Sequence, residues 1–322
     1  MTPNKIIAVR NDRFGEFLLN IPVFRALKDR YPQAELVVVV NPYVKQLAER
    51  VPFIDRTFCW ENKKHSLWEK IDFIRSLKKE KADIVLILNP SREFNFISFF
   101  AGIPIRAGYD RKNSFFLNRK MADTKEQGLK HETDYNLDLL KVIGINETAA
   151  DFRGTLRIED EDFPKDRMGF LGLEDKQFIV LHPWASNPRK EWGFLNFRRL
   201  AERLVMEPKY KLVLVGVKED IKRSEQLSRD LSLIDLTGRT TLLELAGLLK
   251  RSRLLVTNDS GPMHLAAVMG VPTVALFRKF PQAISARRWG PVGPSHQIIE
   301  SENIGDIQVS EVYDAVKKNI EK

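Results

Sequence analysis

The chain of 322 residues is 43% hydrophobic, which is enough for two ordinary domains with separate cores. Its 52 basic and 43 acidic residues leave a net charge of +9, which favours an anionic partner, but no zinc-finger, RNP-type or basic-zipper pattern predicts nucleic-acid binding. The single cysteine, the lack of a signal-peptide core and the lack of an apolar run near the ~20 residues of a membrane span indicate a soluble cytoplasmic protein.

The first half of the chain alternates strand and helix patterns. We expect strands at residues 5–11, 35–40, 57–60, 83–88 and 105–109. We expect helices at residues 16–30, 42–50, 66–80, 92–101 and 131–143. Apolar strands separated by helices predict a parallel sheet covered on both faces.

The pattern breaks at residues 144–176, which read as a linker or an irregular edge, and then restarts. Further strands are expected at residues 178–182, 211–216, 233–236, 254–258 and 273–277, and helices at 193–205, 219–230, 242–251 and 309–320. The sequence therefore predicts an α/β protein with two doubly wound, Rossmann-like domains, residues 1–160 and 161–306. The last helix, in residues 307–322, is compatible with packing on either domain.

The most informative turn follows the expected strand that ends at Asn258. Asp259 or Ser260 can cap the next helix, Gly261 allows close approach of a ligand, and Pro262 suits a first helical turn. Free amides at such a helix start, with the helix dipole behind them, suit a phosphate or diphosphate. A helix start that is only well capped is the alternative.

Ligands of open α/β sheets bind outside the carboxyl ends of the strands, so the loops there carry the candidate groups. Besides the Asp259 turn, these loops are residues 10–16, 182–192 and 216–220.

Five segments together resemble glycosyltransferase family 9, which contains the ADP-heptose:lipopolysaccharide heptosyltransferases. They are Gly15-Glu16 ahead of residues 22–32, Gly108-Tyr109-Asp110-Arg111, His131-Glu132, Lys190-Glu191-Trp192 and the run from Asn258 to Ala267. The resemblance extends from Ile6 to about Gly293. It implies a GT-B fold with two domains facing each other across a cleft, the acceptor in the first and an ADP-sugar in the second, and a last helix that crosses back to the first domain. It also implies an inverting transfer that needs no metal and no cofactor besides the donor substrate.

By this resemblance, Glu16 is the candidate general base, at a position where the family usually has aspartate. An acid that only favours the dipole of a helix start is the alternative. Lys190 matches the family's diphosphate lysine, and Ser186 adds a hydroxyl in the same loop.

The remaining donor contacts are less specific. Glu219 or Asp220 is expected to hold ribose hydroxyls, although both can be helix-start acids. His264 can face the diphosphate or pack on the sheet, and Met263 can fill the core or line the pocket. The family tends to have glycine after Phe277, where this chain has Arg278-Lys279, and the change leaves the donor sugar open.

Phenylalanines and basic residues are interleaved in the first half of the chain. The phenylalanines are Phe94, Phe96, Phe99, Phe100, Phe115 and Phe116. Such a pattern suits an anionic, amphiphilic acceptor, such as a lipid-linked core saccharide, and a peripheral contact with an anionic inner membrane. Phenylalanines at helical spacing are otherwise core residues. The candidate acceptor cations are Arg10, Arg13, Arg92, Arg111, Lys112, Arg119 and Lys120.

Other patterns are excluded or set aside. Asp160-Glu161-Asp162 resembles a metal-binding Asp-x-Asp but falls in the linker, and neither dinucleotide-binding nor P-loop glycine patterns occur. Three hypotheses remain: a heptose transferase of lipopolysaccharide core synthesis, a relative with another nucleotide sugar or acceptor, and a catalytically weak saccharide-binding or sugar-nucleotide-binding protein.

Overall fold

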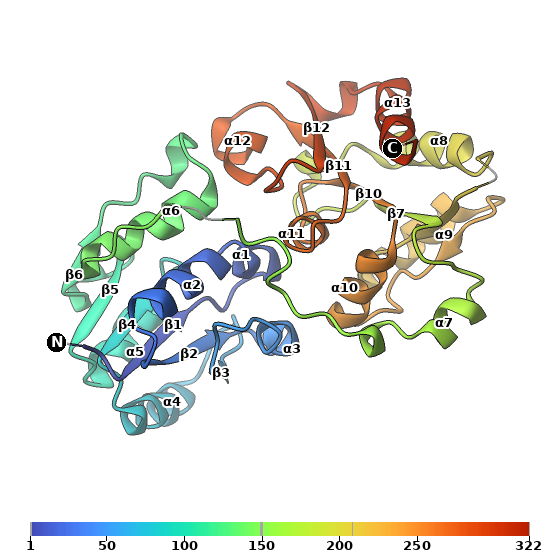
Figure 1. Cartoon of the computed structure of the whole chain (residues 1–322). Coiled ribbons are helices and arrows are strands. Elements are labelled where there is room, and N and C mark those ends of the chain that lie inside the picture. The colour runs from blue at the N-terminus through green and yellow to red at the C-terminus, as the bar shows by residue number, and fades with distance from the viewer. Residues whose placement is uncertain (1, 149–150, 208, 322) are drawn as a thin grey trace. The chain divides into compact units, whose positions relative to one another are not determined.

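The computed structural model describes residues 2–148, 151–207 and 209–321, and the chain divides into two compact units, Met1–Phe152 and Arg153–Lys322 (Figure 1). This division lies before the boundary predicted at residue 160. The reason is that the segment after Phe152 is bonded to the second unit: Gly154 N donates to Val268 O at 2.6 Å, and Lys250 Nζ donates to Ile158 O at 2.6 Å.

The first unit is built on a parallel six-stranded sheet in the order β3-β2-β1-β4-β5-β6. Its strands are β1 (Lys5–Val9), β2 (Glu35–Val40), β3 (Arg56–Cys59), β4 (Ile84–Ile87), β5 (Ile105–Tyr109) and β6 (Arg119–Met121). Its helices are α1 (Phe14–Leu18), α2 (Ile21–Arg30), α3 (Lys45–Ala48), α4 (Leu67–Glu80), α5 (Arg92–Phe100) and α6 (Glu132–Asp138), with the 3-10 helices η1 (Pro42–Val44), η2 (Ser114–Phe116), η3 (Lys125–Gln127) and η4 (Leu139–Ile143). Helices α4 and α5 share one core cluster with alternate residues of the strands, and α2 packs on α6 and β2.

The second unit repeats this plan with a parallel sheet in the order β12-β11-β10-β7-β8-β9. Its strands are β7 (Phe178–His182), β8 (Lys211–Leu214), β9 (Ile234–Asp235), β10 (Leu254–Asn258), β11 (Thr273–Arg278) and β12 (His296–Ser301). Its helices are α7 (Lys165–Phe170), α8 (Phe194–Leu204), α9 (Ile221–Ser228), α10 (Leu242–Arg251), α11 (Gly261–Val268), α12 (Ala286–Trp289) and α13 (Val309–Ile320), with the 3-10 helices η5 (Asp160–Asp162), η6 (Pro188–Lys190), η7 (Lys218–Asp220), η8 (Gln282–Ile284) and η9 (Ile304–Asp306). Both sheets have the strand order of a Rossmann fold, so the predicted doubly wound architecture is confirmed.

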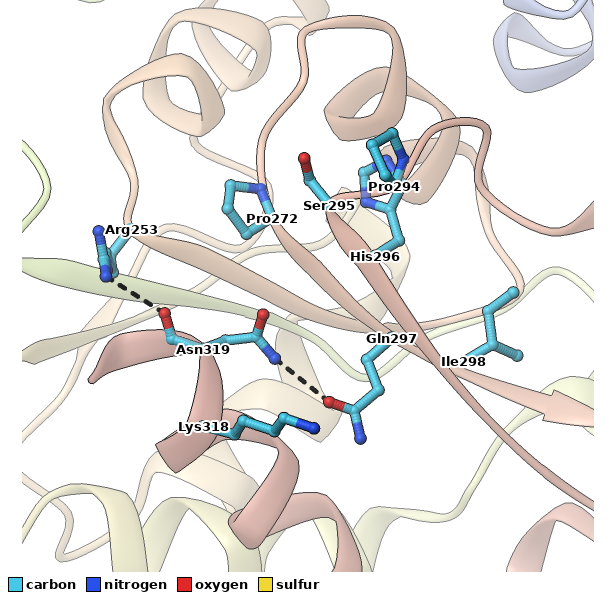
Figure 2. Close-up of a pocket in the computed structure, with 9 residues that line it drawn as sticks. All are labelled: Arg253, Pro272, Pro294, Ser295, His296, Gln297, Ile298, Lys318 and Asn319. Atoms are coloured by element: carbon cyan, nitrogen blue, oxygen red, sulfur yellow. Dashed lines mark hydrogen bonds between the residues drawn. The ribbon is translucent and has the colours of Figure 1, made fainter. Parts of the chain in front are cut away.

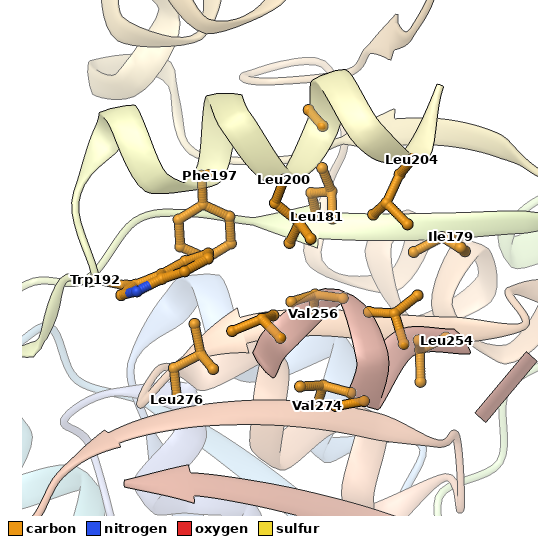
Figure 3. Packing of buried hydrophobic residues seen from close by; sticks show 14 of the residues in the cluster. Ile179, Leu181, Trp192, Phe197, Leu200, Leu204, Leu254, Val256, Val274 and Leu276 are labelled. Carbon is orange, nitrogen blue, oxygen red and sulfur yellow. The ribbon is translucent and has the colours of Figure 1, made fainter. Parts of the chain in front are cut away.

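One core cluster of the second unit lies under α8 (Figure 3). Phe197, Leu200 and Leu204 of α8 pack on β-strand residues such as Leu181 and Val256, all of them fully buried. Because successive residues of a strand face opposite sides, the other residues of β10 and β11 face α11 instead.

Helix α13 also belongs to this core. Its residues Val312, Ala315, Val316 and Ile320 lie in the same cluster as α8, and Tyr210 donates its hydroxyl to Ile320 O at 3.0 Å. The structure therefore places the apolar face of the last helix in the second unit, whereas the resemblance implied that this helix crosses back to the first.

Other differences from the predicted elements are local. The helix predicted at 16–30 is broken into α1 and α2, because Pro22 starts a new helix after Asn20. Strands β6 and β12 and helix α7 were not predicted, since each is short or lies at a polar sheet edge. No helix in the described ranges is long and apolar enough to span a bilayer.

Candidate active site

The turn between β10 and α11 lies at the carboxyl edge of the second sheet. Ser260 is the N-cap residue of α11, but its side chain does not bond the helix amides. Its hydroxyl instead lies 2.9 Å from Thr257 Oγ1 and 3.2 Å from His182 Nδ1. Pro262 has no N–H and Met263 N donates to Ser260 O at 3.2 Å, so the backbone donors that this end of α11 offers an anion are the amides of Ser260 and Gly261.

His182 ends β7, the strand next to β10. Burial lowers the pKa of His182 to about 4, so its imidazole is neutral at neutral pH. A neutral ring can share a hydrogen bond with the hydroxyls of Thr257 and Ser260 and adds no charge behind the turn.

Lys190 reaches the same turn from the loop after β7. Its ammonium lies 2.5 Å from Asp259 Oδ2 and 5.6 Å from the centre of the Trp289 ring. The ring of His264 lies 6.4 Å from that of Trp289. A cation, a carboxylate, an imidazole and an indole therefore gather at the start of α11.

One amide side chain holds this loop on the sheet. Asn258 accepts a hydrogen bond from Trp192 N at 3.0 Å and donates one to Pro183 O at 2.6 Å. The indole of Trp192 donates to Ile307 O at 2.8 Å. These contacts fix the backbone two residues after Lys190, which limits where its ammonium can lie.

A second ion pair braces the loop from the side. Arg223 of α9 binds both carboxylate oxygens of Glu191, at 3.1 and 2.6 Å, and its guanidinium lies 4.6 Å from the centre of the Trp184 ring. Glu191 also accepts from Ala185 N at 3.1 Å. Trp184 in turn packs on Gly216, where an added Cβ would come within 2.5 Å of Trp184 Nε1.

The first unit has its own cluster at the carboxyl end of β1. Arg10 is buried and binds Asp12 Oδ1 through Nε at 2.8 Å and Leu88 O through Nη1 at 3.1 Å. Burial alone would lower the pKa of Arg10, but the carboxylates of Asp12, Glu132 and Glu16 outweigh it and raise that pKa. Arg10 is thus the cation with which these three carboxylates interact.

Glu16 lies in α1, is 9% exposed, and forms an ion pair with Arg13. Burial raises the pKa of Glu16, while Arg13 and Arg10 oppose the rise. Such a carboxylate is more basic than an exposed one, which is a property of a general base.

Behind this cluster lies a buried polar network. Lys125 Nζ donates to Glu132 Oε1 at 2.5 Å and to Asn136 Oδ1 at 2.7 Å, and it lies 4.7 Å from the centre of the Tyr109 ring. All of these residues are under 9% exposed. The network fixes Glu132, one of the acids that act on Arg10.

Comparison with known proteins identifies the family of this chain. The model of glycosyltransferase family 9 (heptosyltransferase) matches residues 71–317. The chain belongs to glycosyltransferase family 9. It is therefore a glycosyltransferase of the heptosyltransferase type, as predicted.

Individual family 9 proteins are similar over most of their length. Lipopolysaccharide heptosyltransferase 2 of Escherichia coli K12 is 25% identical over 287 residues, which cover 85% of this chain and 82% of that protein. The solved structure of E. coli ADP-heptose lipopolysaccharide heptosyltransferase II has a TM-score of 0.84 at 22% identity and covers 98% of both chains. A family 9 glycosyl transferase of Veillonella parvula DSM 2008 has a TM-score of 0.85 at 22% identity, with 98% of this chain and 97% of that chain covered. The two structures support the predicted GT-B fold.

The predicted donor residues differ in where they lie. Lys190, Asp259, Ser260, Gly261, Pro262 and His264 gather at the β10–α11 turn. Met263 is fully buried against Ala275 and Phe277, which is the core alternative that the sequence left open. Ser186 is exposed in the loop before η6.

The two candidate ribose acids differ in their surroundings. Asp220 accepts from Val217 N at 3.1 Å and lies 3.9 Å from Arg223. Burial raises the pKa of Asp220. Glu219 is exposed in η7, which follows β8.

The predicted acceptor cations are more scattered. Arg10 and Arg13 lie beside Glu16, whereas Arg92 and Lys112 are exposed at the carboxyl edge of β4 and β5. Other members are already engaged or lie elsewhere: Arg111 pairs with Asp123, Lys120 pairs with Asp110, and Arg119 begins the edge strand β6 opposite Ala107 of β5. The structure therefore does not bring all seven together.

Sequence reasoning missed several residues of the site. Trp289, Arg223 and Trp184 received no role, although Glu191 stood in a quoted motif. The acidic run Asp160-Glu161-Asp162 forms η5, where Asp162 accepts from Glu159 N at 2.7 Å. In the described part of the chain, no three His, Cys, Asp or Glu side chains cluster as metal ligands.

A surface pocket of the second unit lies elsewhere (Figure 2). It is formed where β10, β11 and β12 begin, so it is at the amino edge of the sheet, away from Asp259. Its Arg253 donates to Asn319 O at 3.2 Å at the end of α13. Arg253 thus serves as a cap of the last helix.

Proposed function

We propose that this family 9 enzyme transfers heptose from an ADP-sugar to a saccharide of the lipopolysaccharide inner core, with inversion and without a metal ion. The observation that carries the proposal is the Lys190 ammonium at the start of α11, 2.5 Å from Asp259. The names of the E. coli relatives, lipopolysaccharide heptosyltransferase 2 and ADP-heptose heptosyltransferase II, support the donor and the acceptor class.

The second unit would bind the donor. Its diphosphate would take the amides at the α11 N-terminus and the ammonium of Lys190, and the exposed carboxylate of Glu219 would accept from ribose hydroxyls. Trp289, which lies beside both Lys190 and His264, would form an apolar wall of this pocket.

The chemistry would be a single displacement. The acceptor hydroxyl attacks the anomeric carbon from the face opposite ADP, and Glu16 takes the hydroxyl proton. The bond between the anomeric carbon and the phosphate oxygen breaks, and its electron pair leaves with ADP. Lys190 and the helix amides stabilise the charge that develops on that oxygen, which is the task a metal ion performs elsewhere.

A ligand screen tests the donor class. We expect ADP to raise the melting temperature of the enzyme, with UDP, GDP and CDP weaker, because a ligand at 100 times its Kd stabilises the folded state by about 2.7 kcal/mol. An equal response to all four nucleotides would remove the basis for an ADP-sugar.

A transfer assay tests the reaction itself. With ADP-heptose and a lipopolysaccharide truncated before its inner-core heptoses, we expect a product whose anomeric configuration, read by NMR, is opposite to that of the donor. The rate should be unchanged by EDTA. A retained configuration or a strict need for a divalent ion would contradict the proposed mechanism.

A further inference from the structure

Five phenylalanines of the first unit form one aromatic cluster, the α5–η2 surface. Phe96, Phe99 and Phe100 come from α5, and Phe115 and Phe116 come from η2. Ring centres lie 4.5 Å apart for Phe96 and Phe100, 5.2 Å for Phe99 and Phe116, and 4.2 Å for Phe115 and Phe116. The rings are thus continuous from one helix to the other.

Much of this cluster is open to solvent. Phe99 is 45% exposed, Phe100 is 51% exposed and Phe115 is 72% exposed. By contrast, Phe94 of the same helix is 1% exposed in the core. Single exposed apolar residues are common, but a contiguous exposed patch of large rings marks a surface that binds something.

The surface is held in a fixed shape. Arg106 lies 5.3 Å from the centre of the Phe99 ring and donates to Phe116 O at 2.8 Å and to Ile103 O at 2.6 Å. Asn95 donates to Lys112 O at 2.9 Å, which ties the segment before η2 to α5. The exposed rings therefore belong to a braced element.

Cations flank the rings at both ends. Arg92 and Lys112 lie at the start of α5, Arg119 lies just after η2, and all three are exposed. Among the described residues, none of the three has an acidic partner within ion-pair distance. The nearby acid Asp110 is already bound by Lys120 at 3.1 Å and by Ser114. The flanks are thus positively charged.

The rings lie away from the carboxyl edge of the first sheet, where α1 with Glu16 follows β1. Helix α5 runs back from the carboxyl end of β4 to the beginning of β5, and Phe99 and Phe100 are at the end of α5 that is far from this edge. A strand of this length spans roughly 15 Å. The rings are therefore poorly placed to contact a saccharide at the carboxyl edge, and another occupant is needed.

We propose that the α5–η2 surface docks the enzyme on an anionic phospholipid bilayer. The three exposed rings would enter the interface, and Arg92, Lys112 and Arg119 would contact phosphate headgroups. The inference rests on the proposed function, since an acceptor anchored in lipid would be presented at this interface.

Vesicle co-sedimentation tests the docking without any saccharide. We expect the full-length enzyme to bind vesicles made of equal parts phosphatidylcholine and phosphatidylglycerol, and to bind phosphatidylcholine alone weakly. The double variant Phe100→Ser/Phe115→Ser should lose about tenfold in vesicle affinity. Phe170→Ser is the matched control, because Phe170 is 91% exposed in the second unit and should not matter.

A second pair of variants tests the charges. Lys112→Gln/Arg119→Gln should reduce binding to the anionic vesicles by about tenfold, and raised salt should remove the difference from wild type. Lys165→Gln, an exposed lysine of α7, is the matched control. Thermal melting confirms that each variant is folded.

Several outcomes would overturn the docking proposal. These are vesicle binding that is absent in wild type, vesicle binding that is equal in the Phe100→Ser/Phe115→Ser variant, or a wild-type dimer that this variant converts to monomer in sedimentation velocity. Failure of the docking leaves the response to ADP intact. Failure of the proposed function would remove the ADP response and leave vesicle binding in place, so the two results are distinguishable.

Discussion

Lys190 Nζ lies 2.5 Å from Asp259 Oδ2, and the two residues follow neighbouring strands, β7 and β10. The ion pair joins the two loops on which the proposed diphosphate site depends. Lys190 is 19% exposed and Asp259 5% exposed, so solvent screens the pair only partly. The lysine is thus fixed by a partner before any donor binds.

Replacement of Lys190 by methionine should impair transfer far more than folding. Loss of one preorganised donor to the leaving phosphate costs about 10²–10³-fold in rate. Steady-state kinetics with ADP-heptose would measure the loss, together with a weaker thermal shift by ADP. Lys209→Met removes an exposed lysine of the same unit and should change neither quantity.

Glu16→Gln should lower kcat by about 10²–10⁴-fold, because the amide cannot take the acceptor proton. ADP should still raise the melting temperature of this variant to the wild-type extent, since Glu16 belongs to the first unit. A variant that turns over normally would rule out Glu16 as the base. Glu16→Asp, which supplies the residue usual in the family, should retain measurable transfer.

The pH dependence of kcat/KM should report the same carboxylate. Burial raises the pKa of Glu16 above its ordinary value of 4.5, and only the deprotonated form acts as a base, so the rate should fall with acidification earlier than for an exposed glutamate. Arg13 holds this pKa down, so Arg13→Ala should shift the acidic limb to still higher pH. An acidic limb that does not move in Arg13→Ala would contradict the assignment.

His182 should make folding stability depend on pH. Its pKa is about 4 in the folded protein against 6.5 for an ordinary histidine, so between these values the unfolded chain binds a proton that the folded chain does not. Stability contributed by the neutral ring is therefore lost as pH falls from 6.5 to 4, by up to about 3 kcal/mol. Urea unfolding of wild type and His182→Gln at pH 7 and pH 4.5 would isolate it, because the variant should lose less.

Gly216→Ala should destabilise the second unit by about 1–3 kcal/mol, because the new methyl group would meet Trp184 Nε1 at 2.5 Å and Cδ1 at 2.6 Å.

Gly169→Ala should have the opposite effect on stability. This glycine lies in α7 with no atom within 4 Å of an added Cβ, so alanine should stabilise by about 0.5–1 kcal/mol. Thermal unfolding of both variants checks the sign of each change.

Local patterns in the sequence predicted most of the scaffold. The apolar run to Asn258 and the small residues after Gly261 identified the β10–α11 turn without any knowledge of the fold, because a buried strand and a helix start are encoded in adjacent residues. Pro22 also indicates the break between α1 and α2, because proline cannot continue the hydrogen bonds of a preceding helix. One continuous helix was nevertheless predicted there.

Contacts between distant segments were beyond the sequence. Glu191 and Arg223 are 32 positions apart, and Asn258 meets Trp192 across 66 positions, so no local spacing reveals either pair. Which phenylalanines are buried and which are exposed also depends on packing. Phe94 and Phe100 lie on one helix, but only Phe94 faces the sheet. The family resemblance supplied Lys190, yet the partner that orients it came only from the structure.

The indole of Trp192 has a consequence for the end of the chain. It donates to Ile307 O just before α13, while the backbone amide of Trp192 donates to Asn258 beside the β10–α11 turn. A deletion that removes α13 would therefore make the backbone next to Lys190 more mobile, although no deleted residue lies in the β10–α11 turn. We expect such a deletion to lower the affinity for the sugar nucleotide before it has other effects.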